Sequence, residues 1–273
     1  MSDWLSITRG DAPLVLSIPH AGLEIPGDVE ETLADSWRAR KDADWRVDEL
    51  YAFAAALGAT VIKTNISRTV IDMNRDPSGA SLYPGQATTE LCPTITFDGE
   101  PLYQPGCEPS ESEIARRRAH YLIPYHTAIA DELARLRRRH QDVVLYDAHS
   151  IRSHAPMLFD GALPIFNIGT NGGVTCAPHF EMAATARCAE SGRAFVVNGR
   201  FKGGYITRHF GKPENGVHAI QMELALRSYF DEPEALTPET WPRPMDAARA
   251  RDTQTTLRAI LTDCIALAEG QSL

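Results

Sequence analysis

Two histidines stand directly after apolar runs of the chain, at points where predicted strands end. His20 follows "LVLSIP", and His149 comes just after Asp147 in "VVLYDAHS". Two histidines and one carboxylate are a common ligand set for catalytic zinc, and they leave a fourth position for water. Such an ion polarises a carbonyl group and lowers the pKa of the bound water. The pattern is therefore compatible with a hydrolytic metal site, while a structural role for each histidine stays open.

Other polar side chains fall at comparable places. Asn74 and Arg75 follow "TVIDM", and Glu223 lies within the apolar run "HAIQMEL". Asp44 opens a helical stretch, where its carboxylate can cap the helix or face the same crevice. A carboxylate that binds no metal is needed to move protons, and Glu223 is a candidate for that role. In open α/β sheets, ligands bind beyond the carboxyl ends of the strands, so these side chains are predicted to meet there.

The elements that must position these residues alternate along the chain. Apolar and β-branched runs predict strands, and apolar residues at helical spacing predict helices. Such alternation indicates an α/β fold with a mostly parallel central sheet flanked by helices on both faces. With no internal repeat or linker, residues 1–273 are expected to form a single domain. The predicted strands cover 13–20, 60–67, 142–150, 163–170 and 194–200, and a further strand is predicted to begin at 216. The predicted helices cover 44–59, 109–140, 179–192 and 244–270.

Local signals refine three of these segments. Ser110 and Glu113 form a plausible capping box, and Pro124 is expected to kink or divide the long helix that follows. Residues 67–79 are expected to run from strand to turn. Residues 80–109 hold much Pro, Gly and Thr, and loops of such length are often binding loops or lids.

Composition narrows the class of protein. The 273-residue chain has a formal net charge of −9, which argues against a nucleic-acid-binding surface but not against a local basic pocket. Its five cysteines are dispersed, as is typical of reduced thiols in a cytoplasmic protein. No run reaches the roughly 18–20 apolar residues that a membrane span needs. We therefore expect a cytoplasmic protein with neither nucleic-acid nor membrane partners.

Several longer blocks add a resemblance. "SIPHAG", "DADWRVDELY", "SRTVIDMNRDPSG", "LYDAHSIRS", "NGRFKGGYITRHFG" and "HAIQMEL" occur in the order of the N-formylglutamate amidohydrolase family. The resemblance extends from about residue 10 to about residue 265, and it includes one exchange, Tyr146 in place of Phe. It implies a zinc-dependent hydrolase with a fold similar to that of zinc carboxypeptidase-like hydrolases.

The resemblance also implies roles for individual residues. His20 and His149 match the metal-binding histidines, and Glu223 matches the catalytic glutamate. The acidic ligand is expected to be Asp44, with Glu24 as the runner-up. The wider carboxypeptidase pattern places a glutamate three residues after the first histidine, where this chain has Leu23.

The implied reaction is the zinc-dependent hydrolysis of N-formyl-L-glutamate to formate and L-glutamate, the last step of a histidine degradation route. Two alternatives remain, namely hydrolysis of another N-acyl amino acid and non-enzymatic binding of an acidic metabolite. The substrate is a small dianion, which needs charge-assisted partners. The residues expected to bind it, with a structural role as the alternative, are Arg68, Asn74, Arg75, Arg152, Arg208 and His209.

Overall fold

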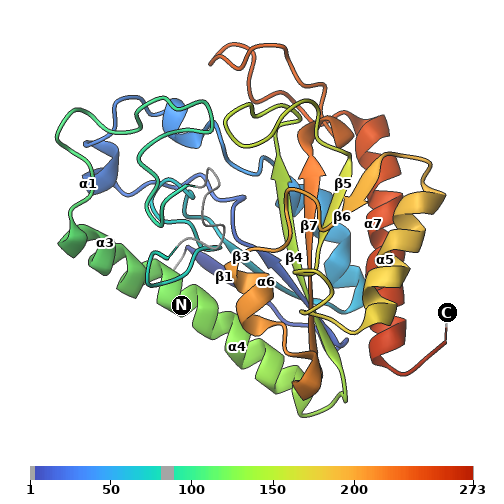
Figure 1. The fold of residues 1–273 in the computed structure, drawn as a ribbon. Coiled ribbons are helices and arrows are strands. Elements are labelled where there is room, and N and C mark those ends of the chain that lie inside the picture. Colours follow the sequence, from blue (N-terminus) through green and yellow to red (C-terminus); the bar gives the residue numbers. More distant parts are fainter. Residues whose placement is uncertain (1–3, 81–88, 273) are drawn as a thin grey trace.

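The computed structural model describes residues 4–80 and 89–272, which build an α/β fold around one mixed sheet of seven strands (Figure 1). The strand order is β1-β3-β2-β4-β7-β5-β6. The four strands from β3 to β7 are parallel, whereas β1 and β5 run antiparallel to their inner neighbours. The predicted fold class is confirmed. The strands are β1 (Leu5–Thr8), β2 (Leu14–Ile18), β3 (Thr60–Thr64), β4 (Val143–Ile151), β5 (Phe166–Gly169), β6 (Phe195–Val197) and β7 (Val217–Ala225).

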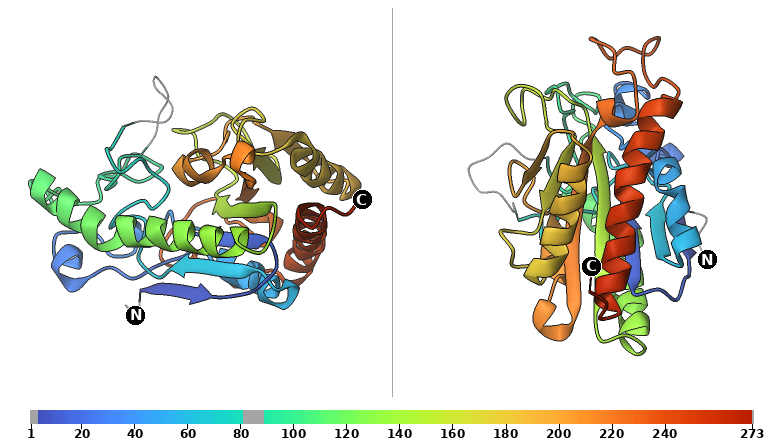
Figure 2. Two further views of the ribbon diagram at one scale, coloured as in Figure 1. Left: turned by 90° about the horizontal axis from the view of Figure 1, so that it is seen from below. Right: turned by 90° about the vertical axis from the view of Figure 1, so that its right-hand side faces the viewer.

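Helices cover both faces of this sheet. The long green α3–α4 segment and α6 lie on one side, and α5 and α7 lie on the other (Figure 1). Figure 2 shows α5 and α7 packed next to each other. In the described part of the chain, no helix is long and apolar enough to span a membrane. The α-helices are α1 (Gly27–Glu30), α2 (Val47–Leu50), α3 (Glu111–Arg117), α4 (Ile123–Arg137), α5 (Pro178–Glu190), α6 (Tyr205–Phe210) and α7 (Ala247–Ala268).

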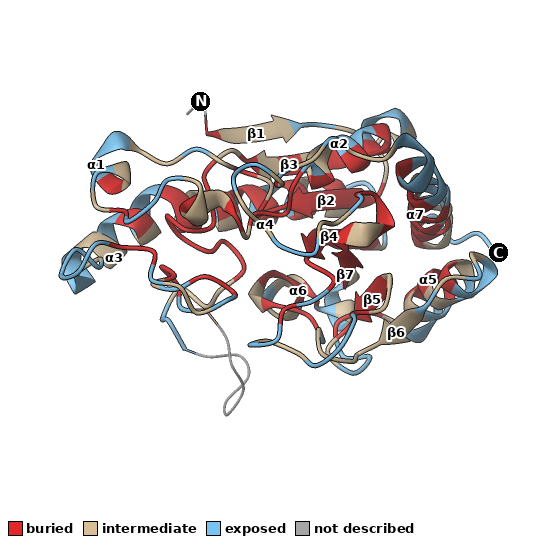
Figure 3. Ribbon diagram, turned by 90° about the horizontal axis from the view of Figure 1, so that it is seen from above, coloured by how far each residue is buried: buried red, intermediate tan, exposed pale blue. Residues whose placement is uncertain are grey.

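The two faces of the central strands differ in composition. Successive side chains of a strand point to opposite faces. In β4, Tyr146 and Ala148 pack into the core under α5 and α7, while Leu145 packs under α4. On the α4 side the apolar pattern then stops, because the next two positions of that face are Asp147 and His149. Figure 3 shows that these central strands are buried, so the polar residues lie inside the protein.

β7 repeats this change on the same face of the sheet. Ile220 and Met222 belong to the core under α5 and α7, whereas Ala219 belongs to the core on the α4 side. Gln221 and Glu223 lie on the same face of β7 as Ala219. Since β4 and β7 are parallel neighbours that pair His149 with Glu223, the two polar stretches lie side by side.

The predicted helix over 109–140 is observed as α3, a π-helical turn (Arg118–Leu122) and α4, which follow one another without a break. Ser110 caps α3, because its hydroxyl accepts a hydrogen bond from the Glu113 amide. Pro124 comes just after the π turn. Proline lacks the N–H that an α-helix would use four residues back, and the wider π turn accommodates that loss. The helix is therefore modified before Pro124 and is not divided there.

Two predicted segments need correction. The stretch 44–59 is helical only in two short pieces, α2 and a 3₁₀ turn (Ala52–Leu57), although Gly58 ends it with a φ of 76° as expected. Arg46, with a φ of 55°, keeps Asp44 outside the helix. Residues 67–79 contain no strand and form an irregular loop with turns, which is buried from 67 to 74. Their apolar side chains pack into the core on the α4 side without pairing in the sheet.

Other segments were not predicted or fall only partly within the described residues. The edge strand β1 and the short helix α6 carry weak periodicity, and the sequence did not reveal them. The region after β7 passes into a 3₁₀ turn (Leu226–Ser228), as expected. All five cysteines are free thiols. Of the predicted loop 80–109, residues 81–88 lie outside the described part of the chain.

Candidate active site

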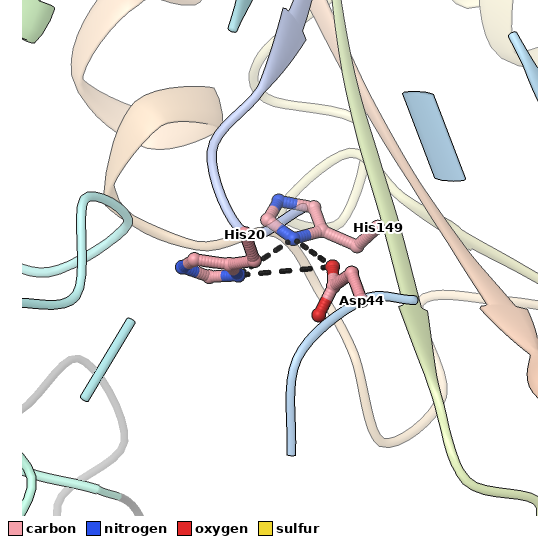
Figure 4. A group of neighbouring side chains, drawn as sticks. All are labelled: His20, Asp44 and His149. Atoms are coloured by element: carbon pink, nitrogen blue, oxygen red, sulfur yellow. Dashed lines mark hydrogen bonds and ion pairs between the residues drawn. The ribbon is translucent and has the colours of Figure 1, made fainter. Parts of the chain in front are cut away.

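Three buried side chains converge beyond the ends of β2 and β4. Figure 4 shows His20 on the loop after β2, Asp44 before α2 and His149 on β4, with their side chains turned toward one another. The Nδ1 atom of His149 lies 3.2 Å from Nδ1 of His20 and 3.3 Å from Oδ2 of Asp44. The remaining distance, from His20 Nδ1 to Asp44 Oδ2, is 3.8 Å.

These distances fit a metal ion. Ligand atoms bound tetrahedrally at about 2.0–2.2 Å lie about 3.3–3.6 Å apart, close to the three separations observed. The potential ligand atoms of His20, Asp44 and His149 all lie within 4.8 Å of one another. Glu24, the alternative acidic ligand, is exposed and pairs through its backbone with Ile66. The structure thus brings Asp44 to the two histidines and leaves Glu24 outside.

Backbone contacts hold the three elements in register. The Asp44 amide donates to the carbonyl of His20 at 3.0 Å, which ties the loop before α2 to the loop after β2. The Asp44 carboxylate accepts a hydrogen bond from the Ser150 amide at 3.0 Å, next to His149. The carboxylate therefore faces the cluster and does not cap α2.

Each histidine also contacts a second carboxylate through its other ring nitrogen. His20 Nε2 lies 2.7 Å from Asp72 Oδ1, and His149 Nε2 lies 2.9 Å from Asp147 Oδ2. A carboxylate that accepts the Nε2 proton leaves the Nδ1 lone pair available for a metal and fixes the ring orientation. Asp147 and Asp72 are therefore both placed to orient a histidine, and the sequence did not reveal the contact of Asp72.

Arginines neutralise only part of the charge at the site. Arg68 Nη2 lies 2.9 Å and Arg75 Nη2 lies 3.4 Å from Asp72 Oδ2. Burial opposes ionisation of Asp72, yet Arg75, His20 and Arg68 together hold its pKa well below the usual range. Because buried charges need partners, a divalent cation would balance what remains. The buried carboxyl groups around the cluster are Asp44, Asp72, Asp147 and Glu223, and the arginines that contact them are Arg68 and Arg75.

The two histidines have opposite pKa shifts. Burial and the positive charge of Arg68 lower the pKa of His20. Burial also acts to lower the pKa of His149, but Asp147, Asp44 and other carboxylates outweigh this effect. They raise the pKa of His149 well above its usual value. The carboxylates around His149 thus favour positive charge on its ring, next to the other two ligand residues.

Glu223 lies beside this cluster on β7. Burial raises its pKa to about 8, and the nearby charges of Asp44 and Asp147 act in the same direction. The Gln221 amide donates to Glu223 Oε2 at 3.3 Å. A carboxyl group whose pKa lies near neutrality can both accept and return a proton, as general acid–base catalysis requires.

A cavity of about 220 Å³ opens onto the cluster. Its polar end carries His20, His149 and Glu223. Thr89, Glu90, Leu91 and Phe97, from the described part of the predicted loop 80–109, contribute to its wall. The apolar part of the wall consists of Leu91, Phe97, Ile151, Leu158 and Phe201.

The predicted substrate-binding residues divide into two groups. Arg68, Asn74 and Arg75 line the cavity, whereas Arg152, Arg208 and His209 are absent from its described wall. Arg152 pairs with Asp98 at 3.0 Å and with Asp42 at 3.2 Å. His209 is exposed on α6, and Arg208 donates from Nε to the Gly203 carbonyl at 2.8 Å.

The side chain of Asn74 connects β4 to α6 through hydrogen bonds. Its amide nitrogen donates to Asp147 Oδ2 at 3.2 Å, and its amide oxygen accepts from the Ile206 amide at 2.9 Å. Gly204 permits this close approach, because a Cβ there would lie 2.3 Å from the Asn74 side chain. Gly204, the second glycine of "FKGGY", is thus needed for the close contact with Asn74, which the sequence did not reveal.

Sequence reasoning missed three residues of the site, namely Asp72, Arg200 and Gln221. Asp72 and Arg200 stand inside the blocks "SRTVIDMNR" and "NGRFKGG", so the resemblance pointed to their neighbourhood without assigning them a role. Arg200 lines the cavity and donates from Nε to the Leu158 carbonyl at 2.6 Å. For Gln221 the signal was its alternation with Glu223 on one strand face.

The fold and the site together define an α/β protein with a buried histidine–aspartate–histidine group that can hold a metal ion. A family model described as N-formylglutamate amidohydrolase matches residues 12–230. The chain belongs to the N-formylglutamate amidohydrolase family, as its motifs indicated.

Curated relatives agree over most of the chain. An N-formylglutamate deformylase from Pseudomonas aeruginosa is 48% identical over 233 residues, which cover 85% of this chain and 87% of the relative. The N-formylglutamate deformylase of Pseudomonas putida is 46% identical over 238 residues, which cover 87% of this chain and 89% of the relative.

Solved structures share the fold. An N-formylglutamate amidohydrolase from Ralstonia eutropha JMP134 aligns with a TM-score of 0.77 at 23% identity, covering 96% of this chain and 98% of its own. A gene product of Agrobacterium tumefaciens aligns with a TM-score of 0.68 at 17% identity, covering 98% of this chain and 95% of its own.

Proposed function

We propose that the chain hydrolyses N-formyl-L-glutamate to formate and L-glutamate, with a zinc ion held by His20, Asp44 and His149. The observation that carries the proposal is the convergence of these three ligand atoms beside Glu223, at the end of a small cavity. The deformylase names of the two Pseudomonas relatives support the choice of substrate.

The cavity suits a small anionic substrate. Its volume of about 220 Å³ is below the roughly 300–1,000 Å³ of sites for drug-sized ligands. N-formylglutamate carries two carboxylates, and arginine binds such groups with paired, charge-assisted hydrogen bonds. We assign the carboxylates to Arg75 and Arg200 on the cavity wall. Arg68 also lines the cavity, but it is more buried than Arg75. Its guanidinium group contacts two carboxylates, Asp72 and Asp44, whereas Arg75 lies 3.4 Å from one of them, Asp72.

The residues of the chain divide the chemistry as follows. When bound, a zinc ion would polarise the formyl carbonyl, lower the pKa of a water molecule and stabilise the oxyanion that forms during the attack. Glu223 accepts a proton from the water that attacks the formyl carbon. It then returns this proton to the amine nitrogen as the carbon–nitrogen bond breaks, which releases formate and L-glutamate.

The Glu223→Gln variant tests this assignment. We expect kcat to fall by about 10²- to 10⁴-fold, since a general base is lost, while one zinc ion per chain stays bound. Metal content and kcat measured on the same preparation check both parts. Glu214→Gln, at an exposed position outside the cavity, is the matched control. Near-normal turnover by the Glu223 variant with zinc bound would contradict the role.

A related reaction on another N-acyl amino acid would use the same metal site and proton transfers. Kinetics with N-formyl, N-acetyl and N-succinyl derivatives of glutamate and aspartate separate the two proposals. We expect the highest kcat/KM for N-formylglutamate. Loss of activity on chelation and its return with zinc would exclude a non-enzymatic binding protein. The single domain over 1–273, the cytoplasmic location and the place in histidine degradation stay predictions.

A further inference from the structure

One arginine connects two parts of the candidate metal site. Arg68 Nη2 lies 2.9 Å from Asp72 Oδ2, and its Nη1 lies 3.5 Å from Asp44 Oδ1. The other oxygen of Asp72 contacts His20 Nε2 at 2.7 Å. A continuous series of charged contacts therefore runs from His20 through Asp72 and Arg68 to Asp44.

Each member of this series has limited freedom to move. Exposure is 3% for His20, 0% for Asp72 and Asp44, and 9% for Arg68, so little water can replace a lost contact. Asp72 Oδ1 also accepts the backbone N–H of Asn74 at 2.9 Å, which fixes the carboxylate.

The Arg68 guanidinium group is held from a second side. Its centre lies 4.8 Å from the middle of the Phe97 ring, within the range of a cation–π contact. A side chain held by an aromatic ring and two carboxylates is preorganised in one position. It is poorly placed to leave those partners for an incoming substrate.

We propose that Arg68 and Asp72 act as one positioning pair, which holds His20 and Asp44 in a fixed relation and so sets the affinity of the site for its metal ion. This inference rests on the proposed zinc-dependent function. It gives Arg68 a different role from the substrate clamp that the sequence suggested. Residues that orient metal ligands typically change metal affinity by about 10- to 100-fold when replaced.

The test measures zinc dissociation constants by competition with a chromophoric chelator, starting from metal-free protein. Asp72→Asn keeps the size of the side chain and removes its charge, and Arg68→Met removes the guanidinium group. We expect each variant to bind zinc about 10- to 100-fold more weakly. Arg68→Lys, which keeps one charge, should recover part of the loss. Circular dichroism confirms that each variant is folded, and if Asp72→Asn does not fold, the two Arg68 variants carry the test.

A partly buried ion pair away from the cavity supplies the control. Asp263 on α7 accepts two hydrogen bonds from Arg187, at 2.7 and 3.1 Å. Asp263→Asn should leave the zinc dissociation constant unchanged, although it also removes the charge of an aspartate that pairs with an arginine.

The KM measured at saturating zinc separates a positioning role from a substrate clamp. We expect Arg68→Met to leave KM for N-formylglutamate unchanged once the site is loaded. Unchanged zinc affinity in both Asp72→Asn and Arg68→Met would overturn the inference, as would a raised KM for Arg68→Met with normal zinc affinity. A wild-type protein that binds no zinc would overturn the proposed function, and this inference with it.

Discussion

The two histidines of the candidate site are oriented by the same kind of contact, which the chain builds in two different ways. His149 and Asp147 are two residues apart on one face of β4, so the strand itself brings them together. His20 and Asp72 are 52 positions apart, and an irregular buried loop carries Asp72 to the histidine. The comparison teaches that a carboxylate–histidine pair can be a local feature of one strand or a product of tertiary packing.

The two pairs also differ in charge. Arg68 and Arg75 share the negative charge of Asp72, whereas Asp147 receives a neutral amide from Asn74. The pKa of His149 is raised and that of His20 is lowered, in line with this difference. A proton in the metal-free protein therefore belongs on His149.

The largest expected effect is common to both histidines. His20→Ala and His149→Ala should each abolish stoichiometric zinc binding and activity, because only two of three ligands remain. Metal analysis after equilibration with one equivalent of zinc checks this. His179→Ala, which changes an exposed histidine on α5, should keep its zinc. If either ligand variant keeps zinc as the wild type does, the assigned ligand set is wrong.

The second prediction distinguishes the two carboxylates. Asp147→Asn should weaken zinc binding by about 100-fold and Asp72→Asn by nearer to 10-fold, since arginines already offset part of the Asp72 charge. Chelator competition on both variants under the same conditions gives the ratio. A larger loss for Asp72→Asn would reverse the comparison.

The third prediction concerns the proton on His149. Zinc uptake by the metal-free protein near pH 7 should release about one proton, because zinc displaces it from a ligand nitrogen. Below the raised pKa of His149, protons compete with zinc, so affinity should rise with pH until that pKa is passed. Calorimetry in two buffers of different ionisation enthalpy counts the protons. A count of zero would show that neither histidine is protonated.

The smallest expected effect on zinc binding is at Arg152. This residue follows His149 by three positions but pairs with Asp42 and Asp98 outside the cavity wall. Arg152→Met should leave the zinc dissociation constant unchanged, while breaking a mostly buried pair lowers the free energy of unfolding by about 3 kcal/mol. Chelator competition and urea unfolding measure the two quantities. Weaker zinc binding would mean that the His149 side also depends on an arginine.

Much of the fold could be predicted because its signals are local. The runs that became β2, β3, β4 and β7 carry period-two or continuous apolar patterns, and α5 and α7 carry helical spacing. β1 and α6 were missed, since a half-exposed edge strand and a helix of six residues leave little periodicity. The stretch 67–79 was expected to run from strand to turn, but its apolar residues are buried without pairing in the sheet, so only the turns are observed.

The sequence by itself determined which residues could do chemistry. It placed His20, Asp147 and His149 at the ends of apolar runs, and its motifs indicated the family and Glu223. Only the tertiary structure brought Asp44, and not Glu24, to the two histidines. It also brought Asp72 to His20 and directed Arg68 and Arg152 toward different carboxylates. The reason is physical. Strand alternation relates residues two positions apart, so it can be read from the sequence. Contacts between residues 24 to 129 positions apart depend on how the loops pack.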